Sequence, residues 1–206
     1  MINNRSITRR IAKQNEKRFG ISVVYGLPIH ITIFEFTKSL RKLFEKKYLR
    51  IFNWSKKRNF HATIIRCNSV KKEIHIPPTL DVVRDVFKSV TSFYLVPDKI
   101  ELLDDGVIRL SFQKAAQLSN INKYYLNKFA RGHKLSINVI QKPWLKIANI
   151  NNVNVDINTN ELNELILKWN KNMTNDLKPI FVTSLKAVYY RDINFIDRTT
   201  LLQIEL

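Results

Sequence analysis

The sequence predicts an α+β fold in which two pseudo-symmetric β-α-β-α-β lobes form one bilobal domain with a central cleft. Its 206 residues suffice for a single full-sized domain, and 45% of them are hydrophobic, enough to fill a core. Apolar residues alternate between a period of two and a helical period, which gives the order β-α-β-α-β and then β-α-β-α-β-β. We therefore expect a basic N-terminal arm at residues 1–18 and one domain at 19–206, with lobes at about 19–106 and 107–206.

The first lobe is expected to open with extended chain and to continue as helix, strand, helix and strand. Residues 21–36 are rich in Ile, Val, Tyr and Phe, which favours extended chain, whereas Leu40, Leu43 and Phe44 fall on one helical stripe. The expected elements are an extended segment at 21–36, bent near Gly26, a helix at 37–49, a strand at 60–67, a helix capped by Thr79, and a strand at 93–103, broken near Pro97.

A hairpin is expected to join the two lobes, because Asp105-Gly106 between two apolar runs is a strong turn signal. Leu118, Ile121 and Tyr125 share one helical face, and Gly132 is placed to end that helix. The expected elements are a strand at 107–112, a helix at 114–130, a strand at 135–141, a helix capped by Asn158 or Thr159, and strands at 179–190 and 200–206. The Asn-rich stretch 144–157 predicts no single element.

The charge is large, positive and uneven. The chain has 35 Lys and Arg against 17 Asp and Glu, a formal net charge of +18. Residues 1–75 hold 18 basic and 4 acidic residues, a net charge of +14, which leaves only +4 for the rest of the chain. A compositional bias would spread evenly, so this asymmetry favours a polyanionic partner, RNA or a nucleotide, that meets the first lobe.

Composition excludes several other classes of protein. Four glycines cannot build a phosphate-binding GxxxxGK loop, a GxGxxG turn or a GxSxG elbow. The single cysteine excludes a disulfide framework and fits a reducing compartment such as the cytoplasm. No apolar run approaches the roughly 20 residues of a membrane-spanning helix. Residues 1–18 lack the apolar core of a secretory signal, but a transit peptide shares their basic composition, so import into an organelle stays open.

Three short motifs place a histidine shortly before a hydroxyl side chain: His30-x-Thr32, His61-x-Thr63 and His133-x-x-Ser136. On a strand, His61 and Thr63 point the same way, about 6.6 Å apart. The imidazole exchanges a proton near neutral pH and the hydroxyl donates to an anionic oxygen. Two such pairs facing across a cleft would supply an acid, a base and two donors for in-line attack on a phosphodiester without a metal. An ordinary half-buried strand explains the same pattern without any function.

The segment His61-Ala62-Thr63-Ile64, preceded by a helix and a Trp-containing loop, resembles the first motif of the 2H phosphoesterase superfamily. That superfamily includes RNA 2′,5′-ligase-like proteins and 2′,3′-cyclic phosphodiesterases, and it has two His-x-Thr/Ser motifs on the central strands of two pseudo-symmetric lobes. The element order of residues 21–206 is similar. The resemblance implies that His61 is catalytic, that Thr63 and Ser136 bind phosphate oxygens, and that the substrate carries a 2′,3′-cyclic phosphate or a 2′-5′ linkage.

The second motif departs from the family pattern. Lys134 stands two residues before Ser136, where the family has histidine, and His133 stands three before it. On a regular strand His133 would face the opposite side, unless a β-bulge at Lys134-Leu135 turns it back. Lys134 would otherwise face the phosphate, where it binds charge but is a poor proton shuttle, because its unperturbed pKa is about 10.4. Strict alternation puts Arg66 at the rim of the phosphate site.

The leading hypothesis is a metal-independent phosphodiesterase, a hydrolase of RNA ends or small nucleotides, with His61 and His133 as its acid–base pair. His30 and Thr32 are additional cleft candidates. The alternative is a catalytically degenerate RNA-binding protein on the same fold, and a basic component of a ribonucleoprotein stays open beside it. The phosphodiesterase and the RNA-binding hypothesis differ at the second motif, where Lys134 stands in the position of the family's histidine.

Neither a cofactor nor a metal is implied by the sequence. The spacings that separate His61, Cys67 and His75 match no standard zinc pattern. The expected partner is RNA or a nucleotide, and the expected oligomeric state is a monomer.

Overall fold

The computed structural model describes residues 2–14, 19–48, 51–69, 76–121, 123–132, 136–151, 158–191 and 197–206. Within them the chain is a mixed α+β fold with five α-helices, two short 3-10 helices and two sheets. The helices are α1 (Asn4–Gln14), α2 (Ile31–Tyr48), η1 (Lys57–Asn59), α3 (Ile76–Phe87), η2 (Ala116–Asn120), α4 (Lys123–Gly132) and α5 (Thr159–Asp176). The strands are β1 (Phe19–Gly26), β2 (Phe52–Trp54), β3 (His61–Ser69), β4 (Phe93–Leu95), β5 (Pro97–Leu102), β6 (Val107–Phe112), β7 (Ser136–Val139), β8 (Trp144–Ile150), β9 (Ile180–Val182), β10 (Ser184–Tyr190) and β11 (Arg198–Glu205).

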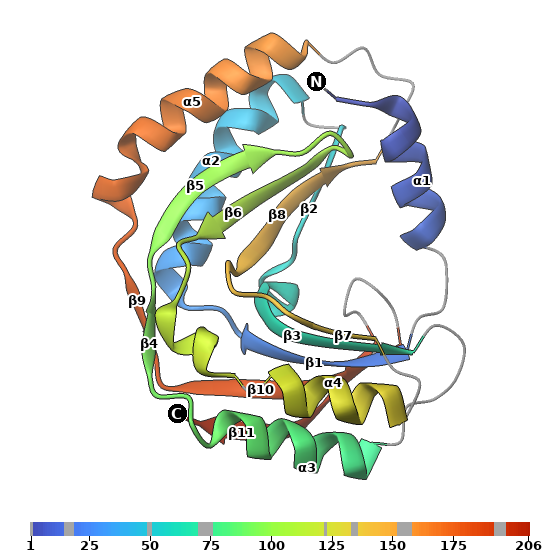
Figure 1. Ribbon diagram of the computed structural model, residues 1–206. Coiled ribbons are helices and arrows are strands. Elements are labelled where there is room, and N and C mark those ends of the chain that lie inside the picture. The colour runs from blue at the N-terminus through green and yellow to red at the C-terminus, as the bar shows by residue number, and fades with distance from the viewer. Residues whose placement is uncertain are drawn as a thin grey trace.

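The larger sheet has nine strands and branches at β3 and β8. Its main path runs β11-β10-β1-β3-β8-β6-β5, with every described pairing antiparallel. One end of β3 pairs with β7 and one end of β8 pairs with β2. Between β3 and β8 themselves the register has a single pair, Ala62 opposite Leu145. The sheet turns sharply at this point, because the two strands share so short a stretch (Figure 1).

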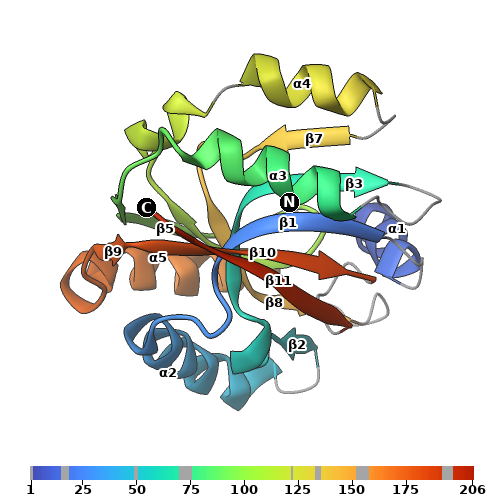
Figure 2. The same cartoon turned by 90° about the horizontal axis from the view of Figure 1, so that it is seen from below.

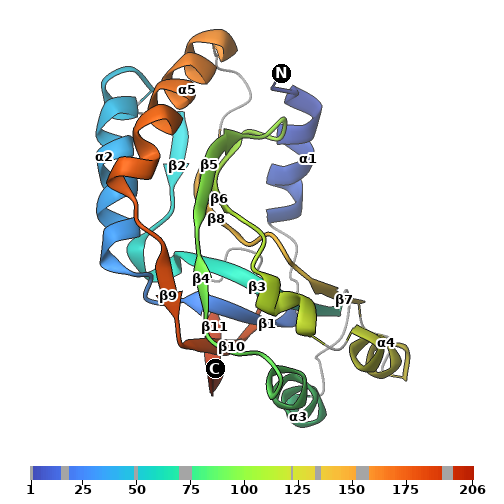
Figure 3. The ribbon, with the colours of Figure 1, turned by 60° about the vertical axis from the view of Figure 1, so that its left-hand side comes forward.

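The helices cover the convex side of the bent sheet in two pairs. In Figures 1 and 3, α2 and α5 lie together against the half that contains β5, β6 and β8, while α3 and α4 lie together against the half that contains β1 and β10. Figure 2 shows the two pairs on opposite sides of the molecule. Helix α1 stands apart from both pairs, across the concave side from β8 and β2. The concave side is therefore bounded by the sheet and by α1.

The order of elements repeats along the chain. The first half runs β1-α2-β2-β3-α3-β4-β5, and the second runs β6-α4-β7-β8-α5-β9-β10. Each half ends on a strand that pairs with the first strand of the other, since β5 pairs with β6 and β10 with β1. The equivalent strands β4 and β9 pair with each other in the two-stranded sheet. Strands β3 and β8 hold the same position in the two halves.

Several local predictions from the sequence are confirmed. The β5–β6 hairpin turns through Asp105 and Gly106, where Gly106 has a φ of 77°, a conformation that favours glycine. Asn158 caps α5, since its side chain accepts a hydrogen bond from the Glu161 amide at 3.2 Å. The break near Pro97 separates β4 from β5. The Asn-rich stretch, for which the sequence predicted no single element, opens with a strand, β8, whose residues from Ile147 onward are buried.

The segment 31–36 is helical, where the sequence favoured extended chain. Its β-branched and aromatic residues raise the strand propensity, but Ile33, Phe36 and Leu40 are buried along one face of α2. Packing of that face against the core outweighs the local preference. The helix predicted at 114–130 is likewise divided, into η2 and α4.

The basic N-terminal segment forms a packed helix in its described part. Asn3 caps α1, accepting from the Arg5 amide at 2.9 Å, and the Asn3 amide donates to the Asp104 carbonyl at 2.8 Å. Ile7 is 1% exposed and belongs to the main core cluster. Arg10 donates to the carbonyls of Asp105 and Ile150. These contacts fix α1 to the β5–β6 turn and to the end of β8. No described helix is long and apolar enough to cross a membrane.

Candidate phosphate-binding site

A basic cavity of about 590 Å³ lies between α1, the β2–β3 connection and the two central strands β3 and β8. Its described lining includes seven cationic side chains and a single carboxylate, that of Asp105. The cations are Arg9, Arg10, Lys13, Lys56, Arg58, Arg66 and Lys146. We call this space the basic cavity.

Strand β3 contributes His61, Thr63 and Arg66 to the basic cavity. The register against β1 shifts between Val23 and Val24, which leaves Ile64 as an extra residue on β3. Such a bulge re-aims the residues that follow it. Because of it, Arg66 joins His61 and Thr63 in the lining, and the sequence expectation that placed Arg66 at the rim missed this. Ile64 and Ile65 are both buried in the core.

Strand β8 repeats this local arrangement with different side chains. Trp144, Lys146 and Asn149 line the basic cavity at the same relative positions, i, i+2 and i+5. The register against β6 shifts between Ile108 and Arg109, which leaves Ile147 as the extra residue. The position equivalent to His61 therefore holds Trp144, and the position equivalent to Thr63 holds Lys146.

Lys146 is a neighbour of His61 across the strand junction. The pairing of Ala62 with Leu145 in antiparallel strands puts His61 opposite Lys146. The pKa of His61 is lowered to about 4. Burial is the largest cause and the charges of Lys146, Arg66 and Arg198 act in the same direction, while the hydrogen bond with the Asn59 carbonyl opposes them. His61 is consequently a neutral imidazole at physiological pH.

The tautomer of His61 is set by the loop before β3. Its Nδ1 lies 2.8 Å from the Asn59 carbonyl oxygen, which can only accept, so Nδ1 carries the proton and Nε2 is the accepting nitrogen. Arg198 on β11 holds the same loop, donating to the Asn59 side chain at 2.9 Å and to the Arg58 carbonyl at 2.5 Å. A residue of the last strand thus positions the catalytic candidate of the first half.

Five of the cations in the basic cavity lack a carboxylate partner. Within the described part of the chain, these five form no ion pair: Arg9, Lys13, Lys56, Arg58 and Arg66. Arg10 is used differently, since it fixes α1 to the β5–β6 turn and burial lowers its pKa. Like charges brought together without counter-ions repel, and a bound anion relieves that repulsion. The Thr63 hydroxyl adds a neutral donor to the same wall.

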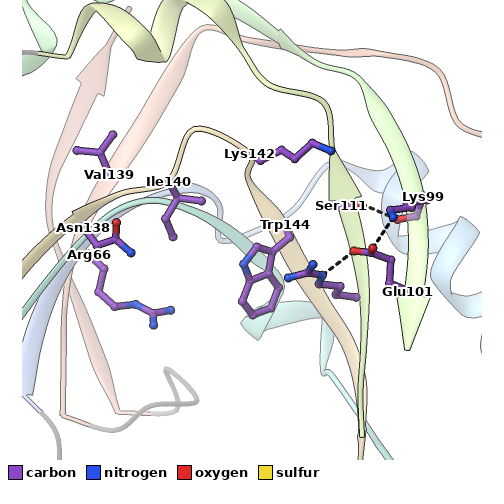
Figure 4. A pocket seen from close by; sticks show the side chains of 10 residues that line it. Arg66, Lys99, Glu101, Ser111, Asn138, Val139, Ile140, Lys142 and Trp144 are labelled. Atoms are coloured by element: carbon purple, nitrogen blue, oxygen red, sulfur yellow. Dashed lines mark hydrogen bonds and ion pairs between the residues drawn. The ribbon is translucent and has the colours of Figure 1, made fainter. Parts of the chain in front are cut away.

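A second cavity of about 440 Å³ adjoins the basic cavity, and Arg66 and Trp144 line both. Figure 4 shows Trp144 between Arg66 and the strand that carries Glu101. Glu101 bridges Lys99 at 2.7 Å and Arg109 at 2.8 Å, which holds the pKa of its carboxyl below the usual range against the opposing effect of burial. We call this space the Trp144 cavity.

The other predicted site residues that the structure describes, Ser136, His30 and Thr32, do not line these cavities. Ser136 is exposed on β7, opposite Asn68 of β3, and lines neither cavity. His30 precedes α2, where its Nδ1 lies 2.8 Å from the Thr32 hydroxyl, and neither residue lines either cavity. His133 and Lys134 lie outside the described residues. Among the described residues, no group of three or more His, Cys, Asp or Glu could hold a metal ion.

Sequence reasoning missed Trp144, Lys146, Asn149 and the contribution of α1. A signal for the first three exists, because Trp144-Leu145-Lys146-Ile147-Ala148-Asn149 has the spacing of polar and apolar residues seen in His61–Arg66. A search for His-x-Thr/Ser motifs misses this segment, because it contains no histidine.

No protein-family model matches the chain, and no curated protein matches its sequence. The structure is similar to the crystal structure of a conserved protein of unknown function, ATU0111, from Agrobacterium tumefaciens. The TM-score is 0.52 and the identity 13%, over 95% of this chain and 88% of that chain. At this identity the match concerns the fold alone.

Proposed function

We propose that the protein binds the phosphate groups of RNA ends or nucleotides in the basic cavity, on a fold of the 2H phosphoesterase type. The cations without carboxylate partners supply the electrostatic attraction, and Thr63 and Arg66 supply directed hydrogen-bond donors. His61 adds a neutral imidazole beside them.

Two pseudo-symmetric lobes with a cleft between them are part of this proposal. The repeated element order divides the chain at the β5–β6 turn, in keeping with lobes at about 19–106 and 107–206. The equivalent residues Ala62 and Leu145 pair with each other, as residues on either side of a twofold axis do. The bulges at Ile64 and Ile147 occupy equivalent places as well.

Binding is favoured over hydrolysis by one observation, the identity of the residues at the second motif's position. A 2H enzyme needs a second histidine where β8 presents Trp144, and a hydroxyl where it presents Lys146. Tryptophan cannot transfer a proton at neutral pH, and lysine with an unperturbed pKa near 10.4 remains a fixed cation. The described lining therefore offers one proton-transferring imidazole and many anion-binding groups.

The experiment is RNA binding as a function of salt with charge-matched variants. The logarithm of the affinity for single-stranded RNA should fall linearly with the logarithm of salt concentration, at about 0.7 per phosphate neutralised. The double variant Lys56→Ala/Arg58→Ala should weaken binding and reduce this slope. The control Arg84→Ala/Lys88→Ala removes the same number of positive charges outside the basic cavity. Arg84 lies on α3 and Lys88 directly after it, and each pairs with an aspartate.

The control should change the affinity far less than the cavity variant. Binding that does not depend on salt, or equal losses in the two variants, would contradict the assignment of phosphate binding to the basic cavity.

A metal-independent phosphodiesterase is the second candidate, favoured by the neutral His61 with its accepting Nε2. If the wild type hydrolyses 2′,3′-cyclic nucleotides and His61→Ala reduces the rate by about 10²–10⁴-fold, the phosphodiesterase hypothesis is correct. If the wild type is inactive, the variant Trp144→His/Lys146→Ser tests the scaffold, because it installs His-x-Ser at the β8 position. Hydrolysis by this variant alone would identify a degenerate site on a catalytic fold.

A further inference from the structure

We propose that the Trp144 cavity binds the nucleobase of the nucleotide whose phosphate lies in the basic cavity, with the base stacked on Trp144. This inference rests on the proposed function and adds an orientation to it. The ligand class becomes a single-stranded nucleotide or RNA terminus whose base is unpaired, and not phosphate alone.

The two cavities differ in how their charges are compensated. In the basic cavity five cations have no ion pair within the described chain. In the Trp144 cavity three of the four cations are already paired, since Lys99 and Arg109 share Glu101, and Lys142 lies 3.0 Å from Asp98. The fourth is Arg66, which lies at the boundary with the basic cavity. A phosphate gains more from the unpaired cations, whereas an uncharged base avoids displacing the existing pairs.

Trp144 provides the stacking surface at the boundary between the cavities. Its ring lines both, and the Arg109 guanidinium lies over it at 5.7 Å from the ring centroid. Aromatic rings stack on bases of every sequence, but only where the faces of the base are not covered by neighbouring base pairs. Arg66 also lines both cavities, so it is placed to contact the phosphate between them.

The Trp144 cavity also carries groups that can meet the edge of a base. Asn138 is exposed on β7 beside Arg66 of β3, and its amide both donates and accepts. The Ser111 hydroxyl donates to the Lys99 carbonyl at 3.0 Å and keeps its oxygen as an acceptor. A volume of about 440 Å³ lies within the range of small-molecule sites.

The test is an NMR titration at low salt that compares ribose 5-phosphate with 5′-AMP and 5′-UMP. In the wild type the nucleotides should bind about 10-fold or more tightly than ribose 5-phosphate, because stacking strengthens binding by about that factor. The indole N–H signal of Trp144 should shift with nucleotides, and that of Trp169, which packs against Phe36, should not. The two nucleotides separate purine from pyrimidine preference.

Substitutions at Trp144 test whether its ring causes the preference for nucleotides over ribose 5-phosphate. Trp144→Leu should bring the ratio of nucleotide to ribose 5-phosphate affinity close to one, and Trp144→Phe should retain most of it. Tyr124→Leu removes an aromatic ring that is 78% exposed on α4 and lines neither cavity, so it should leave the ratio unchanged.

A ratio near one in the wild type, or a ratio that survives in Trp144→Leu, would overturn the base site and leave phosphate binding in place. Failure of the wild type to bind either nucleotides or RNA would overturn the proposed function and this inference together.

Discussion

Acidification from about pH 7.5 to about pH 5 is expected to destabilise the folded protein through His61. Burial and nearby cations lower the pKa of this imidazole to about 4 in the folded state, whereas the unfolded value is about 6.5. Between these two values the unfolded chain binds more protons than the folded one. Stability therefore rises with pH in this window, is fully present above about pH 6.5, and is lost as the pH falls toward 4.

The size of the loss follows from the two pKa values. At about pH 5 the unfolded imidazole is almost fully protonated and the folded one almost fully neutral, which corresponds to about 2 kcal/mol. Because His61 is only partly buried by surface area, solvent screening reduces the effect, and we expect a loss of about 1–2 kcal/mol. Urea unfolding at the two pH values measures it.

The variant His61→Gln separates this effect from all other titrations, because its side chain does not change charge. The wild type should lose about 1–2 kcal/mol more stability than this variant between the two pH values. Parallel losses in both proteins would refute the assigned cause. So would an NMR titration in which the His61 ring protonates near its ordinary pKa of about 6.5.

Two further predictions concern β3 and its neighbour β1. Burial raises the pKa of the Cys67 thiol on β3 to about 12. A thiol reagent at about pH 8 should therefore leave the native protein unmodified and react only after unfolding. Rapid labelling of the native protein would contradict the burial of β3. Gly20→Ala should cost about 1–3 kcal/mol in thermal or urea unfolding, because the new methyl would clash with the Tyr190 hydroxyl and lie 2.8 Å from the Cys67 carbonyl. The control Gly132→Ala meets nothing within 4 Å and should be neutral or slightly stabilising.

The order of elements could be predicted because its signals are local. Asp105-Gly106 specifies a hairpin, Asn158 specifies a helix start, and the run Val107–Phe112 specifies a strand, each with no help from distant residues. The helical state of Ile31–Phe36 could not be predicted in this way. Its side chains favour a strand, and only burial of one helical face against the rest of the core decides otherwise.

The pairing of strands depends on contacts between residues far apart in the sequence, and no local pattern predicts them. Strand β7 contains Ser136 and was expected to be the central strand of the second half, but it pairs with the end of β3. The strand that stands opposite β3 at Ala62 is β8, which follows β7 by a few residues. A bulge cannot be read from composition either, so the place of Arg66 in the cavity emerged only from the shift in register at Ile64.

The asymmetry between β3 and β8 determines what the cleft can do. Strand β3 contributes an imidazole, His61, which can exchange a proton. At the equivalent positions strand β8 contributes the aromatic ring of Trp144 and the charged side chain of Lys146. Burial, with a further contribution from the charge of Lys146, lowers the pKa of His61 and keeps the imidazole neutral at physiological pH. A phosphate bound between them would oppose that effect and raise the pKa of His61, so affinity should increase as the pH falls toward 5. If the proposed function is correct, phosphate binding at this pair of strands is therefore expected to be coupled to the protonation of one imidazole, that of His61.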